Sequence, residues 1–553
     1  FENVAQRHSL NAADKLELER IVGLYEVKGA PEATTNYQER YYKRLKDVLS
    51  GVDTDWLSQP LHTGVGQRYN LRLEGGSDEF RWGTSISYSD TEGAMKGSSR
   101  RVFNGDITLM YTINNLIFRN YTSIGNTNGA ESKYGTFSNF VNQQPYNKPW
   151  DETGALVRYF DGFGPENSST QNPLYDATLN SFDKENVLDI INNFSIEWRP
   201  IADFTVRGQL GVSTNRSSSD YFLPGEHSYF NTSTYSTATG ALRKGMYTYG
   251  NGEDVSYDGR LTLNYSKSFA EKHQIYAGLD MSIAESRYTS YEFIAEGFGN
   301  DDLSFIGNAL QYEENKAPTG EKTTSRRIGA TGNVNYTYNN RYYIDGSFRV
   351  DGSSQFGSNK RYAPFWSVGI GWNLHNERFM QNQHVLNNFR LIASIGETGT
   401  VDFSRAAVET MYKYIPGTRY LLWNAAHLQG LGNPDLTWQT TREMNLGIRF
   451  GLWDDRITGE FDVYSKKTSN LLSLKDIPSS MGFNSYSDNI GEVENSGFEA
   501  SLSAYIVRDN QRDFNWMISG QLVYNKNEIT KLSDAIIAQN EAYLKKDDII
   551  DII

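Results

Sequence analysis

Cysteine is absent from this 553-residue sequence, and histidine occurs only seven times. Without cysteine, disulfide bonds, thiolate metal sites and thiol catalysis are all excluded. The histidines are scattered, so no HExxH or similar metal-ligand spacing occurs. The sequence also lacks the GxSxG turn of serine hydrolases and the glycine-rich loop that binds nucleotide phosphates. These absences predict that the protein is not an enzyme and needs no cofactor.

The sequence also lacks an excess of basic residues and long apolar runs. The 53 Lys and Arg residues against 67 Asp and Glu residues give a net charge of −14, which argues against a nucleic-acid partner. The mean hydropathy is −0.59, and no apolar run approaches the roughly 18 residues that a transmembrane helix needs. A membrane β-barrel stays possible, because its strands alternate apolar and polar residues.

Aromatic residues are abundant, since they form 13% of the chain. Membrane barrels place aromatic girdles at both interfaces, although a large soluble β-protein with aromatic cores would explain the composition equally well. The sequence begins at Phe1 and ends at "KKDDIIDII", just after a strand-like segment. We therefore expect it to be a piece of a longer precursor.

The start of the chain differs from the rest. Residues 10–50 are predicted to be helical in two pieces, with Leu16, Ile21, Val22 and Leu24 on one face and Asn36 as the cap of the second piece. After residue 67 the apolar residues alternate with polar ones, which is the period of a β-strand.

Alternation is clearest in the second half of the chain. In 342–350, for example, apolar and aromatic residues alternate with polar ones, and 367–373, 444–450 and 457–463 repeat the arrangement. So many charged residues on one face would be costly in a dry core but not in a wet lumen. The predicted lumen-facing residues are Asp345, Arg349, Asn373, Asn445, Arg449, Glu460 and Asp462. Ile370 is then predicted to face lipid, where Arg would be destabilising, and Gly371 to face the lumen, where Arg would be tolerated.

The connections between the predicted strands alternate in length. The short ones lie at 113–115, 199–203, 338–341, 451–455 and 508–512. The long polar ones lie at 125–185, 215–254, 289–323, 397–438 and 468–494. An outer-membrane barrel has short periplasmic turns and long extracellular loops. The sequence therefore predicts an all-β, transmembrane antiparallel β-barrel of roughly 16 strands in a bacterial outer membrane, crossed many times by the chain.

Three blocks resemble one family of such barrels. They are "RVDGSSQFGSNKRYAPFWSVGIGWNLHNERFM" (349–380), "GNPDLTWQTTREMNLGIRFGLWDDRITGEFDVYSKKTSNLL" (432–472) and "NIGEVENSGFEASL" (489–502). They are similar, in the same order, to segments of SusC-like TonB-dependent transporters of the Bacteroidetes. The resemblance implies part of a barrel of about 22 strands, with the plug domain not in this chain. It divides the sequence into 1–67 (start of the barrel region with a helical loop insertion), 68–530 (barrel wall) and 531–553 (truncated barrel continuation).

The resemblance also implies a function. Such proteins import nutrients, here oligosaccharides or peptides, with a SusD-like surface lipoprotein as a lid and the TonB–ExbB–ExbD complex as energy source. It further implies contact with outer-membrane lipid and a dimer of transporter–lipoprotein pairs. The alternatives are a TonB-dependent receptor for a siderophore or cobalamin, a surface β-rich glycan-binding adhesin or glycan-degrading protein, and a barrel enzyme.

Three further groups of residues are candidates for function. The loop after residue 350 is predicted to be architectural, with a ligand role for Lys360 or Arg361 as the alternative; its family-motif residues are Asp351, Gly352, Ser353, Ser354, Phe356, Gly357, Arg361 and Tyr362. Six loop aromatics could stack on sugars, cover a partner, or belong to a girdle or loop core: Tyr221, Phe222, Tyr229, Phe230, Tyr420 and Trp423. Carboxylates at 251–259 and 299–304 could bind loop calcium, but solvated charge explains them more simply.

Overall fold

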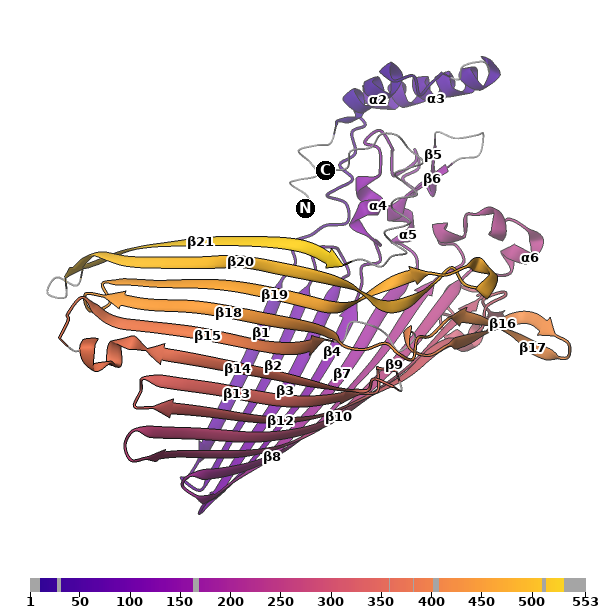
Figure 1. Cartoon of the computed structure of the whole chain (residues 1–553). Coiled ribbons are helices and arrows are strands. Elements are labelled where there is room, and N and C mark those ends of the chain that lie inside the picture. Colours follow the sequence, from indigo (N-terminus) through magenta and orange to yellow (C-terminus); the bar gives the residue numbers. More distant parts are fainter. Residues whose placement is uncertain are drawn as a thin grey trace.

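The computed structural model describes residues 10–26, 31–162, 169–357, 359–380, 382–400, 407–509 and 514–531. Its main element is one antiparallel sheet of 17 strands that curves into the wall of a barrel (Figure 1). Each long strand pairs with the next one along the chain, and the remaining strand is the two-residue β11, which pairs with β10. The predicted number of roughly 16 strands and the all-β fold class are therefore confirmed. The predicted segment 531–553 lies outside the described residues except for Lys531.

The strands of the wall are long. Their bounds are β1 Gly66–Gly76, β2 Phe80–Glu92, β3 Ser99–Ile113, β4 Leu116–Ala130, β7 Phe182–Ile201, β8 Phe204–Leu223, β9 Met246–Phe269, β10 His273–Glu296, β11 Gln311–Tyr312, β12 Thr319–Tyr338, β13 Tyr342–Ser353, β14 Tyr362–Asn373, β15 Leu386–Thr400, β18 Gln439–Leu452, β19 Ile457–Asp476, β20 Ser485–Asp509 and β21 Phe514–Lys531. Several of them extend well into the segments that the sequence predicted to be loops. A membrane strand needs only about 9–11 residues, so the extra length rises beyond the bilayer.

Short and long connections alternate along most of the chain, as predicted. The exception is the connection between β14 and β15, which lies at the end of short connections but contains two 3-10 turns. The end of the wall with short connections, called the turn end below, is made of tight turns in which non-glycine residues adopt positive φ angles, such as Asn114 and the pair Asn339 and Asn340. Asn adopts this left-handed conformation at low cost, and the resulting turns match the twist of the strands that they join. The opposite end, called the loop end, carries the long connections.

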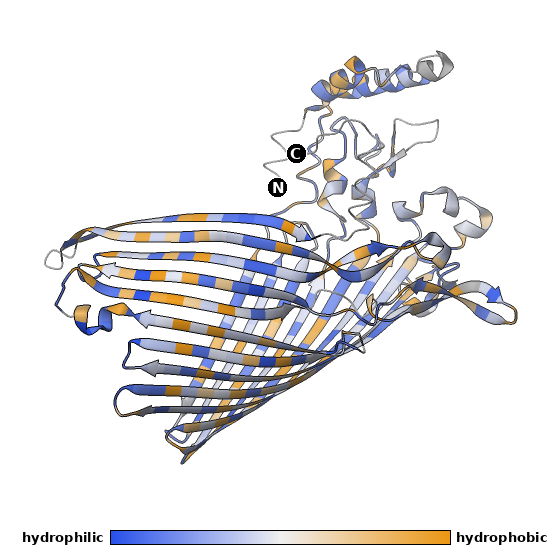
Figure 2. Ribbon diagram, viewed as in Figure 1, coloured by the Kyte–Doolittle hydropathy of each residue, from blue (hydrophilic) through white to orange (hydrophobic). Residues whose placement is uncertain are grey.

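Hydrophilic and hydrophobic residues follow one another at short intervals along most strands of the wall (Figure 2), and the register assigns them to opposite faces. One row of directly opposed residues runs Ile344, Ile370 and Leu446 through Ala393, and a neighbouring row one position away runs Asp345, Gly369 and Asn445 through Ser394. Opposed residues point to the same side, and successive residues to opposite sides. The apolar row is largely exposed, with Ile370 at 53%. We call this apolar side the outer face and the polar side the inner face.

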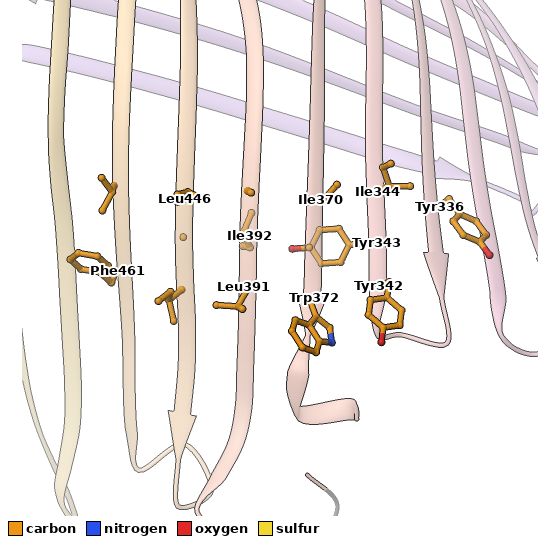
Figure 3. A pocket seen from close by; sticks show the side chains of 15 residues that line it. Tyr336, Tyr342, Tyr343, Ile344, Ile370, Trp372, Leu391, Ile392, Leu446 and Phe461 are labelled. Carbon is orange, nitrogen blue, oxygen red and sulfur yellow. The ribbon is translucent and has the colours of Figure 1, made fainter. Parts of the chain in front are cut away.

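Aromatic rings of the wall lie over glycines of the adjacent strand. Tyr343 is opposite Gly371 in the register, and Figure 3 shows its ring across β14 beside Ile370. A Cβ atom at Gly371 would collide with that ring. A side chain at Gly371 therefore requires Tyr343 to move, and the prediction that Gly371 tolerates Arg did not include this steric requirement. Phe450 covers Gly459 and Tyr464 approaches Gly497 in the same way, an arrangement that shields glycine backbone in a sheet.

Small elements fill the connections and termini of the wall. They are α2 Ala12–Ile21, α3 Pro31–Leu49, α4 Phe137–Val141, α5 Pro173–Asp176, α6 Ala238–Ala241, the strand pair β5 Tyr159–Asp161 and β6 Ser169–Gln171, the hairpin β16 Met411–Tyr420 and β17 Trp423–Gly430, and 3-10 turns at Ser228–Phe230, Ser233–Tyr235, Ile306–Asn308, Leu374–Asn376, Arg378–Met380 and Ser479–Met481. None of the helices within the described ranges has the length and apolar character needed to cross a membrane.

The predicted helices near the start form, but they pack differently from the prediction. Helix α2 is capped by the Asn11 side chain, which accepts a hydrogen bond from the Asp14 amide at 2.7 Å. Helix α3 begins at Pro31, so Asn36 is not its cap. Leu16 is buried, whereas Ile21 and Val22 are exposed, so the predicted apolar face is wrong. Helix α2 instead buries the polar side chain of Glu19.

Candidate functional site: the inner wall and the loops at its mouth

The inner face of the wall is its concave side. A cavity of about 530 Å³ is lined by inner-face residues of β7, β8, β9, β10, β12 and β13, including Arg260 and Asp351, and by Trp438, which lies directly before β18. Strands so far apart in the sheet share one cavity because the sheet bends around this side. The lining is mainly polar and carries charges of both signs, so this side suits water and polar solutes rather than lipid.

Four of the predicted lumen-facing residues form one cluster on β18 and β19. Arg449 lies 2.8 Å from an Asp462 oxygen and 3.4 Å from a Glu460 oxygen. Asn445 donates a long, 3.5 Å hydrogen bond to Asp462. These contacts join directly opposed strands, since Arg449 is opposite Glu460. The cluster is a cross-strand charge network that stays accessible, because Glu460 is exposed.

The remaining three predicted residues lie elsewhere on the same face. On β13, Asp345 accepts a hydrogen bond from Asn335, and Arg349 contacts Asp351 at 2.5 Å and Thr331 at 2.8 Å. Three strand intervals separate Asp345 from Asn445 in the register, so these two polar groups do not form a compact site.

Asn373 is buried at the turn end of the wall. Its side chain donates to the Asn340 carbonyl at 2.8 Å and accepts from Arg390 at 2.8 Å. Both bonds hold the connection between neighbouring strands, so Asn373 braces a turn. The structure thus places all seven residues on the inner face, but as a dispersed lining with one brace and not as a single binding pocket.

The family-motif loop after β13 is anchored by an aromatic residue. Phe356 is buried and stacks on Trp438 with ring centroids 4.1 Å apart, and Phe365 meets the same indole edge-on at 5.5 Å. Gly357 lies so close to the Pro434 carbonyl that no side chain would fit there. Asn359 also donates to the Asp435 side chain at 2.9 Å. The loop after β13 and the segment before β18 are therefore locked together.

The same segment is tied to the beginning of β20. Asn433 donates to the Ser487 carbonyl at 3.1 Å, while the Asn489 side chain accepts from the Thr437 amide at 2.9 Å and donates to the Thr437 carbonyl at 3.1 Å. Each of these residues lies in, or within two positions of, one of the three blocks that carried the family resemblance. The blocks therefore meet in space, and we call this contact set (Phe356, Gly357, Asn359, Asn433–Trp438, Ser487 and Asn489) the loop lock.

Other residues of the motif loop shape its backbone. Ser353 and Ser354 pair through their amides with the Arg361 and Arg326 carbonyls at 3.1 and 2.9 Å. On the outer face, the Tyr362 ring covers Gly352. The Arg361 side chain is exposed. These contacts favour the architectural interpretation of the loop, and a ligand role for Arg361 or Lys360 stays a prediction.

The six candidate aromatics divide by burial. Phe222 is fully buried, in a cluster with Tyr247 and Phe298, and Phe230 is buried against Tyr229 and Tyr235. Neither can stack on a ligand in this structure, so for these two the loop-packing interpretation holds. The exposed members are Tyr229 and, on the hairpin of β16 and β17, Tyr420 and Trp423, while Tyr221 is half-buried. Ligand contact by these four stays a prediction.

The possible calcium loops do not have the expected geometry. Residues 251–259 belong to strand β9, where Glu253 points to the outer face toward Arg216 and Asp254 points to the inner face. In 299–304, the Asp301 side chain accepts from the Gly225 amide at 2.9 Å. Among the residues that the structure describes, no group of three or more Asp, Glu or His side chains is arranged to hold a metal ion.

Sequence reasoning missed the most tightly packed part of this region. Trp438 and Asn489 both lie in the quoted blocks, but alternation assigns each residue only to a face and cannot pair loops that are distant in the chain.

The buried carboxylate of Glu19 on α2 was also missed. Glu19 accepts hydrogen bonds from Tyr25 at 2.9 Å and Tyr146 at 3.0 Å, and burial raises the pKa of both phenols. The signal available in the sequence was that Glu19, an acidic residue, occupies a position on the same helical face as Leu16.

Comparison with known proteins identifies relatives along most of the chain. The family described as "TonB dependent receptor-like, beta-barrel" matches residues 118–544. TonB-dependent receptor P39 of Formosa agariphila is 29% identical over 87% of this chain and 44% of its own length, and TonB-dependent receptor SusC of Bacteroides thetaiotaomicron is 27% identical over 92% and 51%. The structure of the RagAB peptide transporter matches with a TM-score of 0.72 and 25% identity, covering 87% of this chain and 53% of that one. The chain therefore spans about half the length of the relatives that it matches.

Proposed function

The chain belongs to the TonB-dependent receptor family, as SusC-like β-barrel wall, and we propose that the protein imports oligosaccharides or peptides across the outer membrane. The observation that carries this proposal is the similarity to SusC and to the RagAB peptide transporter over nearly the whole described wall. With the family assigned, the turn end is periplasmic, the loop end is extracellular and the inner face lines the lumen.

The inner face supports a transport role in chemical terms. Several of its charged groups are paired with neighbours on the wall, as Arg449 is with Asp462 and Arg349 with Asp351. A solute passing along such a lining meets many weak, already satisfied polar groups and no single strong site. A transporter needs this property, because it must release what it binds.

Partners follow from the same relatives and belong to the proposal. A SusD-like surface lipoprotein would cover the extracellular mouth, the TonB–ExbB–ExbD complex would act through a plug not contained in this chain, and two transporter–lipoprotein pairs would form a dimer. The loop lock supports this arrangement, because it gives the mouth a fixed rim against which a lid could close.

An uptake experiment in the native bacterium tests the proposal. Cells that make the full-length protein, cells that lack it and cells that lack TonB would be given isotope-labelled oligopeptides or oligosaccharides. We expect uptake of one class of cargo only in the first strain, and purification in mild detergent should recover a surface lipoprotein with the barrel. Uptake of ferric chelates or cobalamin instead would favour the receptor alternative, and equal uptake in all three strains would refute import.

A further inference from the structure

A row of ion pairs crosses the outer face of the wall just beyond its apolar band, on the extracellular side. On β10, the outer-face residue after Ile283 is Glu285, and on β12 the one before Ile328 is Arg326. The same change from apolar to charged occurs on β15 at Glu397 and on β18 at Arg442, next to Ile395 and Met444. On β12, β15 and β18 the charge is the next outer-face position after the last large apolar side chain, whereas on β10 the aromatic residues Tyr291 and Phe293 lie farther along the same face.

Cations and carboxylates pair along this row, which we call the outer belt. The pairs and their N–O distances are Arg101–Asp90 3.4 Å, Arg216–Glu253 2.8 Å, Arg326–Glu285 2.5 Å, Arg442–Glu397 3.0 Å and Lys467–Glu492 2.9 Å, and Arg287 also contacts Glu285. They connect β2 with β3, β8 with β9, β10 with β12, β15 with β18, and β19 with β20.

The register shows that two separate parts of the belt lie at about the same height in the membrane. The row of residues directly opposite Arg442 passes through Trp366 and Phe348 and reaches β12 at Gly332, six residues from Arg326. Strands tilted by about 35–45° and spaced about 4.8 Å apart displace a level line by roughly one residue per strand. Four strand intervals separate β12 from β18 in the sheet. The offset of six residues is therefore close to what points at one level require.

The cations form the outermost layer of the belt. The Arg326 side chain is 66% exposed and its partner Glu285 22%, and for Arg442 and Glu397 the values are 57% and 22%. The cation is the more exposed partner in the other pairs as well. A chain with a net charge of −14 thus presents a row of cations beside its apolar band, each more exposed than the carboxylate that it pairs with.

We propose that the outer belt binds the phosphate groups of anionic lipids in the outer leaflet of the outer membrane. Guanidinium groups match phosphate oxygens with two parallel hydrogen bonds, and five of the six belt cations are Arg. The carboxylates hold each cation in place, and the cation is the more exposed partner in every pair. Belt cations would thereby fix the depth of the barrel and retain a shell of phosphorylated lipid.

The test uses the full-length protein, stripped of lipid in detergent and placed in phosphatidylcholine nanodiscs that contain a minority of lipid A. Native mass spectrometry then counts the lipid A retained per barrel. We expect the triple variant Arg287→Gln, Arg326→Gln, Arg442→Gln to weaken lipid A retention by roughly tenfold or more. The matched control removes the same charge from the inner face with Arg260→Gln, Arg349→Gln and Arg449→Gln, and should retain lipid A as the unmodified protein does. Replacement of the belt arginines by Lys should preserve most of the retention.

Two outcomes would overturn the proposal. One is equal loss of lipid A from both triple variants, which would show that total charge matters and the belt does not. The other needs no variant and is independent of assembly: if the unmodified barrel retains dephosphorylated lipid A as well as lipid A, phosphate is not what the belt recognises. Competition by free inorganic phosphate would assign the site to the anion alone and would also contradict a lipid site.

Discussion

The wall and the extracellular segments bury their apolar side chains in opposite ways. In the wall, large apolar residues such as Leu446 and Ile370 lie on the outer face and are exposed in the absence of lipid. Among the described residues, the four clusters of buried hydrophobic side chains lie instead at the loop end, in the long connections or at the ends of strands. One of them packs Trp56, Phe140 and Phe160 together, far from any membrane-facing surface.

This difference shows that the chain is adapted to two solvents, lipid around the wall and water around the long connections. In the wall the strand ladder satisfies the backbone, and lipid takes the place of a core, so burial there depends on the membrane. The extracellular segments stand in water and are stabilised by the ordinary hydrophobic effect. The two parts should therefore respond to different substitutions and be disrupted separately, which the following predictions test.

The largest expected effect is on an extracellular core. Phe140 is completely buried, so Phe140→Ala should destabilise the local fold of 131–181 by about 3–5 kcal/mol. Limited proteolysis of this loop should accelerate strongly. The wall should stay folded, as judged by its heat-modifiable mobility in detergent gels. Val141→Ala, at the neighbouring exposed position, is the control. Collapse of the whole barrel in Phe140→Ala would show that the two parts are coupled.

A somewhat smaller effect is expected in the wall. Ile370→Arg places a charge on the lipid side and should destabilise the barrel by about 2–4 kcal/mol if it lies near the midplane. Gly369→Arg is the control, because a Cβ atom there points to the inner face and makes only ordinary contacts with Asp345 and Ser394. Urea unfolding in lipid vesicles measures both. Equal stability of the two variants would mean that the faces have been assigned incorrectly.

The loop lock should respond more weakly. Asn489→Ala removes one hydrogen-bond acceptor and two donations, to Thr437 and Asn470, and should cost about 1–3 kcal/mol locally. Hydrogen exchange of the segment before β18 should increase. Ser487→Ala is the control, because Ser487 joins the lock through its backbone carbonyl. Unchanged hydrogen exchange in Asn489→Ala would show that the loop lock does not make this rim rigid.

The smallest effect is expected at the surface of the extracellular segments. Lys43 donates to the Asp161 carboxylate at 3.0 Å and holds the pKa of that carboxyl below its usual range. A lowered pKa means that the pair stabilises the fold above the carboxyl's ordinary value of about 3.9, and that this contribution is lost as the pH falls through the lowered value. Lys43→Met should remove this acid dependence of loop proteolysis and change little at pH 7, because both groups are exposed.

The alternation of apolar and polar residues, together with the lengths of the connections, was enough to predict most of the fold from the sequence. Period-two patterns such as 444–450 fix which residues share a face, and the parity of the connections distinguishes the two ends of the wall. The strand extensions above the membrane were missed, because there both faces meet water and no alternation is required. Residues 485–494 of β20, for example, were predicted to be loop for that reason.

The site was less accessible to sequence reasoning than the fold. Face assignment identified the residues of the inner face, but it could not show that Asn373 braces a turn. Whether Phe222 is exposed or buried depends on Phe298, 76 positions later in the chain. The loop lock likewise depends on contacts between loops that no local pattern encodes.

The rings that cover glycines have a consequence for how this wall changes over evolutionary time. Tyr343 occupies the space that a side chain at Gly371 would need, and Phe450 and Gly459 share the same relation. Neither position of such a pair is free to vary alone, since a larger residue at the glycine requires a smaller one opposite. Across homologous sequences these cross-strand pairs should therefore covary, and that covariation would report strand register without any structure.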